Sequence, residues 1–194
     1  IKSSKYIIEG DWSGAAFHLV GAAISGEVKI HGLNQNSLQA DKAILEALVL
    51  CGAKVIIHED FIQVKRLELN SFSFDATDCP DLFPVLASLA SCCDGVSVIN
   101  GISRLINKES NRAKSIKLEF AKIGVKVVLD RNHMYIHGSK MIKGAITNSH
   151  NDHRIAMALS IMATVSKGPI EIINSDVVAK SYTTFYKDLE VLAA

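Results

Sequence analysis

The chain has 194 residues, of which 48% are hydrophobic, and its formal net charge is +1. This composition is sufficient for a substantial core, while the near-zero charge and lack of a Lys/Arg run argue against nucleic-acid binding. No apolar run reaches the roughly 18 residues of a membrane-spanning helix. The four cysteines have neither CxxC nor zinc-ligand spacing, which favours a reduced, cytoplasmic enzyme or binding protein without a metal.

One sequence pattern occurs three times along the chain. Asp11, Asp81 and Asp152 are spaced 70 and 71 residues apart, and each precedes an apolar run followed by a β-branched stretch. A period of this length indicates stacked copies of one supersecondary unit. The first copy predicts these elements: strand 6–9, helix 13–24, strand 28–31, helix 39–51, strand 54–58 and strand 61–64.

The second and third copies follow the same β-α-β-α-β-β order. The second predicts strand 71–75, helix 81–92, strand 96–99, helix 111–123, strand 126–129 and strand 134–137. The third predicts strand 145–148, helix 152–164, strand 170–173 and helix 181–192, and it lacks the last two strands. Because exposed strand edges are hazardous, we expect the missing strands to come from elsewhere in a longer polypeptide, as the start at Ile1 also suggests.

The two helices of each copy differ in character. The first is apolar almost all round, which is typical of a helix enclosed by other elements, and the second is amphipathic. We therefore predict an α/β (α+β) domain with pseudo-threefold symmetry. Its three buried helices run parallel inside a shell of short sheets, and the third repeat is incomplete.

Several charged side chains lie at predicted helix N-termini, where free N–H groups favour anions. Arg112, Arg154 and Lys180 would form a site for phosphate and carboxylate groups, because guanidinium forks match those anions. Asp81 and Glu109, beside such cations, could transfer protons. We expect these ends to meet on one side of the domain.

Structural explanations remain open for most of these residues. An Asp at a helix start is most often a cap, so Asp81 and Asp152 could serve only that role. Arg112 and Lys180 could be surface charges. His150 begins an HxxH pattern that has no third metal ligand. A nucleophilic Cys79 would need a companion base, and the sequence offers none.

Six motifs then resemble one enzyme family along essentially the whole chain. They are EGDWSGAAF, NSLQADKAILEAL, the PD at 80–81, KESNR, NDHRIAMALS and AKSYTTFYKDL. Together they resemble the C-terminal domain of the 5-enolpyruvylshikimate-3-phosphate synthase family (3-phosphoshikimate 1-carboxyvinyltransferase). Asn111 departs from the usual Asp, Thr184 stands where Pro is common, and no role is carried over to Arg104.

The resemblance implies a two-domain enzyme of the shikimate pathway, which supplies chorismate for aromatic amino-acid biosynthesis. The enzyme transfers the enolpyruvyl group of phosphoenolpyruvate to the 5-hydroxyl of shikimate 3-phosphate and releases phosphate, with no cofactor or metal. Residues 1–194 would form a single domain, its C-terminal half. Without its N-terminal domain, this chain is expected to be inactive.

The resemblance also implies roles for individual residues. Asp81 would bind the shikimate hydroxyls and accept a proton, Lys108 would contact the attacking hydroxyl, and Glu109 would protonate the methylene carbon of phosphoenolpyruvate. The phosphoenolpyruvate anions would be held by three cations: Arg112, Arg154 and Lys180.

Two other functions stay open. One is the related UDP-N-acetylglucosamine enolpyruvyl transferase, against which KESNR and NDHR weigh. The other is a non-catalytic anion-binding module.

Overall fold

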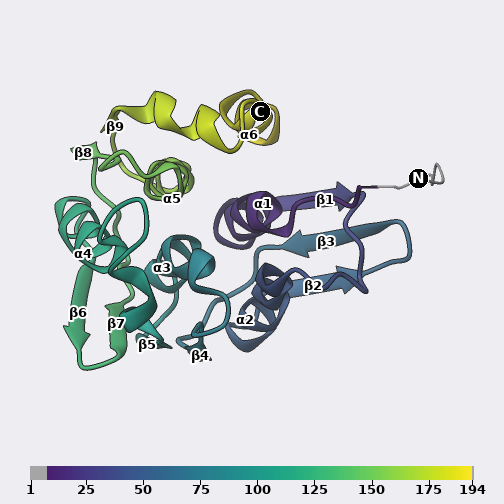
Figure 1. Ribbon diagram of the computed structural model, residues 1–194, viewed down its shortest axis with the longest axis horizontal. Helices are drawn as coiled ribbons and strands as arrows, with labels where there is room; N and C mark the ends of the chain where they lie inside the picture. Colours follow the sequence, from purple (N-terminus) through teal and green to yellow (C-terminus); the bar gives the residue numbers. More distant parts are fainter. Residues whose placement is uncertain (1–7, 194) are drawn as a thin grey trace, which may run out of the picture.

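Three helices pack against one another at the centre of the computed structural model, which describes residues 8–193 (Figure 1). They are α1 (Trp12–Ser25), α3 (Phe83–Ser91) and α5 (His153–Ala163), the first helix of each repeat. Nearly all of their residues are buried, as their apolar sequences predict. One hydrophobic cluster joins these helices and extends from Trp12 to Phe185.

Three short sheets surround the central helices (Figure 1). The first repeat contributes an antiparallel sheet in the order β1 (Glu27–His31), β3 (Phe61–Lys65), β2 (Lys54–Ile57). The second contributes the order β4 (Ser73–Asp75), β5 (Val96–Asn100), β7 (His133–His137), β6 (Lys126–Asp130). The third contributes β8 (Ala145–Asn148) and β9 (Ile170–Ile173), which pair in parallel as β4 and β5 do.

The second helix of each repeat lies outside the central three (Figure 1). These outer helices are α2 (Ile44–Leu50), α4 (Arg112–Lys122) and α6 (Phe185–Ala193). Short 3-10 turns join the elements: η1 (Ala40–Ala43), η2 (Pro80–Leu82), η3 (Ile102–Leu105) and η4 (Ser175–Lys180). No helix among the described residues combines the length and apolar character needed to cross a membrane.

Some predicted boundaries need correction. The predicted helix 81–92 begins as the 3-10 turn η2, because Pro84 has no N–H to donate to the Pro80 carbonyl. The predicted helix 39–51 likewise begins with η1. The predicted strand 6–9 starts outside the described residues, and Ile8 and Glu9 have no regular secondary structure.

The prediction for the last helix was wrong at its start. The segment before it forms η4 and an irregular link, and α6 begins only at Phe185 rather than at 181. The Thr184 hydroxyl donates to the Asp188 carboxylate, and the Asp188 N–H donates to the Thr184 carbonyl. The Thr184 carbonyl thus accepts the first i→i−4 bond of α6, so the helix begins at the next residue.

Gly138 provides a test of how the second repeat packs. A Cβ at this position would lie 1.7 Å from the Cys93 carbonyl oxygen, so the backbone would have to move. We expect Gly138→Ala to lower the free energy of unfolding by about 3 kcal/mol, measured by urea denaturation. Gly26→Ala is the matched control, because a Cβ there meets nothing within 4 Å. Equal stability of the two variants would contradict this packing.

Candidate active site

Asp81 lies where three cationic side chains meet. Its Oδ1 atom is 3.1 Å from Lys108 Nζ and 2.6 Å from Arg112 Nη1, and its Oδ2 atom is 3.2 Å from Arg154 Nη2. These residues come from η2, from the segment before α4, and from the first turns of α4 and α5. The structure therefore brings together four of the six predicted site residues around a single carboxylate.

Side-chain caps position the helix starts that carry the arginines. Asn111 accepts a hydrogen bond from the Lys114 N–H (3.2 Å), so it caps α4 as an aspartate would. Asp152 accepts one from the Arg154 N–H (3.0 Å) and caps α5, as Asp11 caps α1. No side chain in the described part of the chain caps η2 or α3, so the interpretation of Asp81 as a cap was wrong.

Arg112 is fully buried and contacts three carboxylates. Its Nε donates to Asp152 Oδ2 (2.8 Å), and its two terminal nitrogens donate to Asp81 and Glu109. Burial alone would lower the pKa of Arg112, but Asp152 and the other two carboxylates raise it. The alternative that Arg112 is a surface charge was therefore wrong.

The same cations keep Asp81 ionised. Burial would raise the pKa of Asp81, but the charges of Arg154 and Arg112 and the hydrogen bond from Lys108 outweigh it and lower the pKa to about 2. A carboxylate with this pKa accepts hydrogen bonds strongly at neutral pH. It becomes an effective base only when part of the surrounding positive charge is drawn away.

Arg154 retains unused hydrogen-bonding capacity. Its Nη2 reaches Asp81, its Nη1 is 3.9 Å from Asp41 Oδ2, and its buried Nε has no hydrogen-bond partner within the described residues. An unpaired buried donor is costly, so it favours a ligand with acceptor oxygens. Arg154 is thus suited to bind a phosphate or carboxylate, since a guanidinium can donate two parallel bonds.

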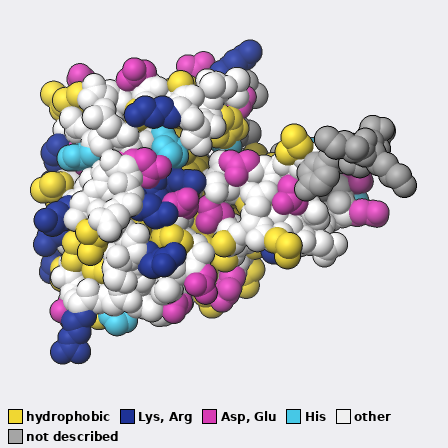
Figure 2. Space-filling view, viewed as in Figure 1, with side chains coloured by type: hydrophobic (Ala, Val, Ile, Leu, Met, Phe, Trp, Pro, Cys, Tyr) yellow, Lys and Arg dark blue, Asp and Glu magenta, His cyan; other side chains and the backbone are white. Residues whose placement is uncertain are grey.

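Acidic and basic side chains alternate across the site. Figure 2 shows them side by side over the region of α3, α4 and α5. Glu109 belongs to this network through Arg112, and its Oε1 lies 4.0 Å from His153 Nδ1. Burial, with the charge of Arg154, lowers the pKa of His153, so its ring is neutral at pH 7. The site is therefore a network of ion pairs rather than a purely cationic surface.

Lys180 is the predicted site residue that the structure does not bring into this network. It is exposed and ends η4, five residues before α6 begins at Phe185, so it is not at a helix N-terminus. Within the described residues, no hydrogen bond or ion pair joins it to Asp81, Lys108 or Arg154. Its contribution to the site remains a proposal that rests on the family motif.

Asp41 is a site residue that sequence reasoning missed. It is buried, it accepts a hydrogen bond from the Ser13 hydroxyl, and it faces Arg154. Burial raises its pKa despite the hydrogen bond from Ser13 and the charge of Arg154. The repeat contained a signal, because Asp41 follows Asp11 by 30 residues, as Asn111 follows Asp81.

Two further residues considered from the sequence have other surroundings. Burial raises the pKa of Cys79 to about 12, so its thiol is not activated as a nucleophile. His150 points to a different carboxylate from His153: its Nε2 is 2.8 Å from Glu119, whereas His153 faces Glu109. The HxxH pattern thus places its two rings in separate contacts.

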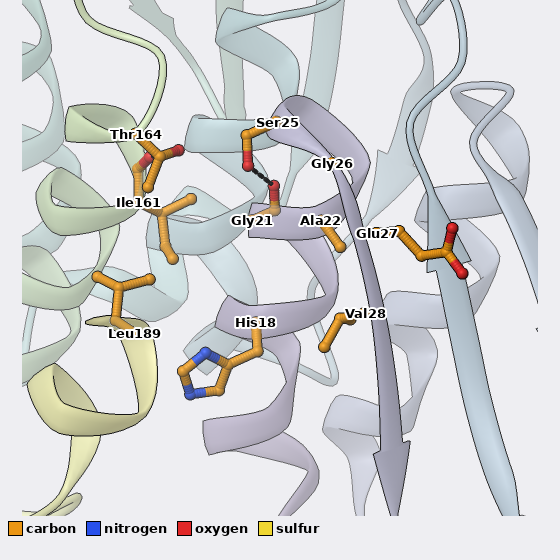
Figure 3. A pocket seen from close by; sticks show the side chains of 10 residues that line it. All are labelled: His18, Gly21, Ala22, Ser25, Gly26, Glu27, Val28, Ile161, Thr164 and Leu189. Carbon is orange, nitrogen blue, oxygen red and sulfur yellow. Dashed lines mark hydrogen bonds between the residues drawn. The ribbon is translucent and has the colours of Figure 1, made fainter. Parts of the chain in front are cut away.

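A separate cavity of about 250 Å³ lies between α1, α5 and α6 (Figure 3). Its lining includes His18, Ile161 and Leu189, and it contains none of the six predicted site residues. Burial lowers the pKa of His18, so the ring is neutral at pH 7, and its Nε2 lies 3.1 Å from the Tyr182 hydroxyl. The ion-pair network around Asp81 is therefore the candidate active site.

The fold and the site define a protein of three related α/β repeats, the second of which has the full β-α-β-α-β-β order, with an acid–base network suited to anionic substrates. The sequence pattern of the family described as EPSP synthase (3-phosphoshikimate 1-carboxyvinyltransferase) matches residues 1–189. The chain belongs to this family. Its predicted fold class and its resemblance to the family are thereby confirmed.

Individual relatives support the assignment. The protein named 3-phosphoshikimate 1-carboxyvinyltransferase in Clostridium novyi is 38% identical over 188 residues, which are 97% of this chain and 43% of that protein. The one in Pyrococcus abyssi is 40% identical over 189 residues, 97% of this chain and 46% of that protein. The structure of EPSP synthase from Acinetobacter baumannii covers 96% of this chain with a TM-score of 0.87 and 29% identity. The chain spans about half the length of these relatives.

Proposed function

We propose that this chain supplies one half of the active site of a 3-phosphoshikimate 1-carboxyvinyltransferase. The reaction moves the enolpyruvyl group of phosphoenolpyruvate onto the 5-hydroxyl of shikimate 3-phosphate and releases phosphate. The observation that carries this proposal is the meeting of Lys108, Arg112 and Arg154 at Asp81. Membership of the EPSP synthase family supports it.

The proposed arrangement of the whole protein follows from the length of the relatives. Residues 1–194 form one domain, and a second, N-terminal domain covers Asp81 and its neighbours when substrates bind. Closure of that kind excludes water and strengthens the electrostatic interactions inside. The protein is proposed to act in the cytoplasm, in keeping with the four free cysteines among the described residues.

Proton transfer is proposed to use the two carboxylates that accept from the terminal nitrogens of Arg112. Asp81 accepts the proton of the 5-hydroxyl as that oxygen bonds to phosphoenolpyruvate, and Lys108 contacts the same hydroxyl. Glu109, in its protonated form, gives its proton to the methylene carbon, and the resulting carboxylate takes a proton back from that carbon as phosphate leaves and the double bond re-forms. The substrate anions would draw Arg154 and Arg112 toward themselves, so the pKa of Asp81 would rise when a base is needed.

The anionic groups of phosphoenolpyruvate are proposed to be bound by Arg112, Arg154 and Lys180. Arg154 is the best supported of the three, because its buried Nε has no hydrogen-bond partner among residues 8–193 and its Nη1 is 3.9 Å from Asp41. Arg112 already binds three carboxylates, so an incoming carboxylate would replace Glu109, whose side chain is 44% exposed. Lys180 would reach the phosphate from η4.

Arg154→Lys tests the anion site. In the full-length protein we expect the KM for phosphoenolpyruvate to rise by about tenfold or more, since lysine keeps the charge but loses the planar fork. Steady-state kinetics with saturating shikimate 3-phosphate would measure the change. Arg131→Lys, in the exposed turn between β6 and β7, is the control and should leave the KM unchanged. A wild-type KM in Arg154→Lys would remove Arg154 from the site.

Substrate specificity can be tested on the same protein. Calorimetric titration with shikimate 3-phosphate and with UDP-N-acetylglucosamine should show binding of the first and not of the second. Turnover of phosphoenolpyruvate with shikimate 3-phosphate would exclude a non-catalytic anion-binding module. Binding of the UDP sugar alone would overturn the proposed substrate.

A further inference from the structure

Glu119 is a buried carboxylate that the proposed reaction does not use. It lies on α4 and is 1% exposed. It accepts hydrogen bonds from the Asn148 N–H (2.9 Å) and from Lys122 Nζ (2.7 Å), and His150 Nε2 lies 2.8 Å from it. Burial would raise the pKa of Glu119, but the bonds from Lys122, His150 and Asn148 outweigh it and lower the pKa. Glu119 is therefore an ionised acceptor that holds several donors.

Arg112 and Glu119 lie on the same face of α4. They are seven residues apart, which is about two helical turns. Arg112 binds Asp152 at one end of the 148–152 segment, and Glu119 binds Asn148 and His150 at the other. One helix face thus fastens both ends of the segment that leads into α5.

That segment has a backbone conformation that needs support. His150 and Asn151 both lie in the left-handed region, with φ of 53° and 58°. Non-glycine residues adopt this region at an energetic cost and keep it only where surrounding contacts enforce it. Local hydrogen bonds help: the His150 N–H donates to Asn148 Oδ1 (2.7 Å), and the Asn151 N–H donates to Ser149 Oγ (3.2 Å). Glu119 adds the long-range contacts that tie the turn to α4.

The turn determines where α5 begins and therefore where Arg154 lies. Asp152 and Arg154 follow it directly, and the Arg154 guanidinium is held by one bond of 3.2 Å to Asp81. A small relaxation of the turn would shift the guanidinium relative to Asp81. The position of the Arg112 guanidinium is less sensitive to such a relaxation, because hydrogen bonds to three carboxylates hold it.

We propose that Glu119 is a positioning residue that holds the turn at His150 and Asn151 and thereby places Arg154 for phosphoenolpyruvate. This inference rests on the proposed function, since it assumes that Arg154 binds that substrate. Glu119 touches no substrate. It acts through the Asn148 N–H and the His150 ring, from the far end of the α4 face that carries Arg112.

The test compares Glu119→Gln with Lys122→Ala in the full-length protein. Glutamine keeps the shape but removes the negative charge, so the charge-assisted bonds to the Asn148 N–H and to the His150 ring become weaker neutral ones. The His150 ring must also change its tautomer to accept from the glutamine N–H. We expect the KM for phosphoenolpyruvate to rise about tenfold and kcat to change by less than about threefold. Lys122→Ala removes the partly exposed partner of Glu119 and leaves both contacts to the turn, so its KM should stay at the wild-type value.

A second variant separates positioning from general destabilisation. In Glu119→Gln with His150→Gly, glycine adopts the left-handed conformation without the cost of a side chain. The double variant should recover at least half of the lost affinity for phosphoenolpyruvate. If Glu119→Gln only destabilised the fold, Tm and the active fraction would fall while the KM stayed unchanged. His150→Gly would then have no lost affinity to restore.

The outcomes distinguish this inference from the proposed function. If Arg154→Lys raises the KM while Glu119→Gln leaves it unchanged, the positioning role is overturned and the anion site stands. An unchanged KM in Arg154→Lys would count against the proposed function itself. A fall in kcat alone in Glu119→Gln, or no recovery with His150→Gly, would also overturn the positioning role.

Discussion

Arg112→Met is expected to lower the free energy of unfolding by about 3–5 kcal/mol. Arg112 and Asp152 are both fully buried, and their side chains form a direct ion pair of 2.8 Å. Methionine would fill much of the space but would leave the Asp152 carboxylate buried without its countercharge. An uncompensated buried charge is far more costly than the loss of an exposed ion pair. Urea denaturation of this chain would measure the change.

Two further variants test the reason for that effect. Lys108→Met removes a cation from the same Asp81 carboxylate, but its side chain is 29% exposed, so the loss should stay below about 1 kcal/mol. Adding Asp152→Asn to Arg112→Met should restore part of the stability, because asparagine still caps α5 and carries no charge. A loss of about 1 kcal/mol or less in Arg112→Met would show that the network contributes little to the fold.

Asp81→Asn is expected to lower kcat of the full-length protein by about 10²–10⁴-fold, with a much smaller change in the KM for phosphoenolpyruvate. Asparagine can still accept a hydrogen bond from Lys108 or an arginine, but it cannot take up the proton of the attacking hydroxyl. Pre-steady-state and steady-state kinetics with both substrates would measure the effect. If kcat stays within about threefold of the wild type, Asp81 is not the proton acceptor.

The acid unfolding of the same variant provides an independent check. The pKa of Asp81 is lowered from 3.8 to about 2 in the folded chain. Its carboxylate therefore stabilises the fold above about pH 4, and this contribution is lost as the pH falls from about 4 to about 2. In Asp81→Asn this part of the pH dependence should be missing. An identical acid transition in both proteins would contradict the contacts around Asp81.

The sequence by itself predicted the repeats and most of their elements. Apolar runs after Asp11, Asp81 and Asp152 predicted α1, α3 and α5, because a helix that is apolar all round is stable only when other elements enclose it. The β-branched stretches of the repeat similarly predicted most of the strands in the described residues. The start of α6 was missed, because the 3-10 turn η4 and the Thr184–Asp188 hydrogen bond depend on local backbone conformation, which hydrophobic periodicity does not reveal.

Apart from Asp41, which was missed, and Lys180, which lies outside the ion-pair network, the members of the candidate site were predictable, but their pairing was not. Residue types and motifs pointed to Asp81, Lys108, Glu109, Arg112 and Arg154, and the repeat placed them near helix starts. Sequence alone could not distinguish a buried Arg112 from a surface charge, because the same residue suits either place. Its burial became favourable only when packing of α4 against α5 brought Asp152 within 2.8 Å of its Nε.

The tertiary structure also decided what Asp81 and Glu119 do. Asp81 stands at the sequence position of a helix cap, but Pro84 prevents a regular first turn there. Its carboxylate is instead surrounded by Lys108, Arg112 and Arg154. In the sequence, Glu119 is one of several polar residues on an amphipathic helix. In the structure, β8 and the turn after it pack against α4 and bury its carboxylate. Charged side chains acquire such roles through distance and burial, because Coulomb energies depend on both, and neither quantity is encoded in local sequence.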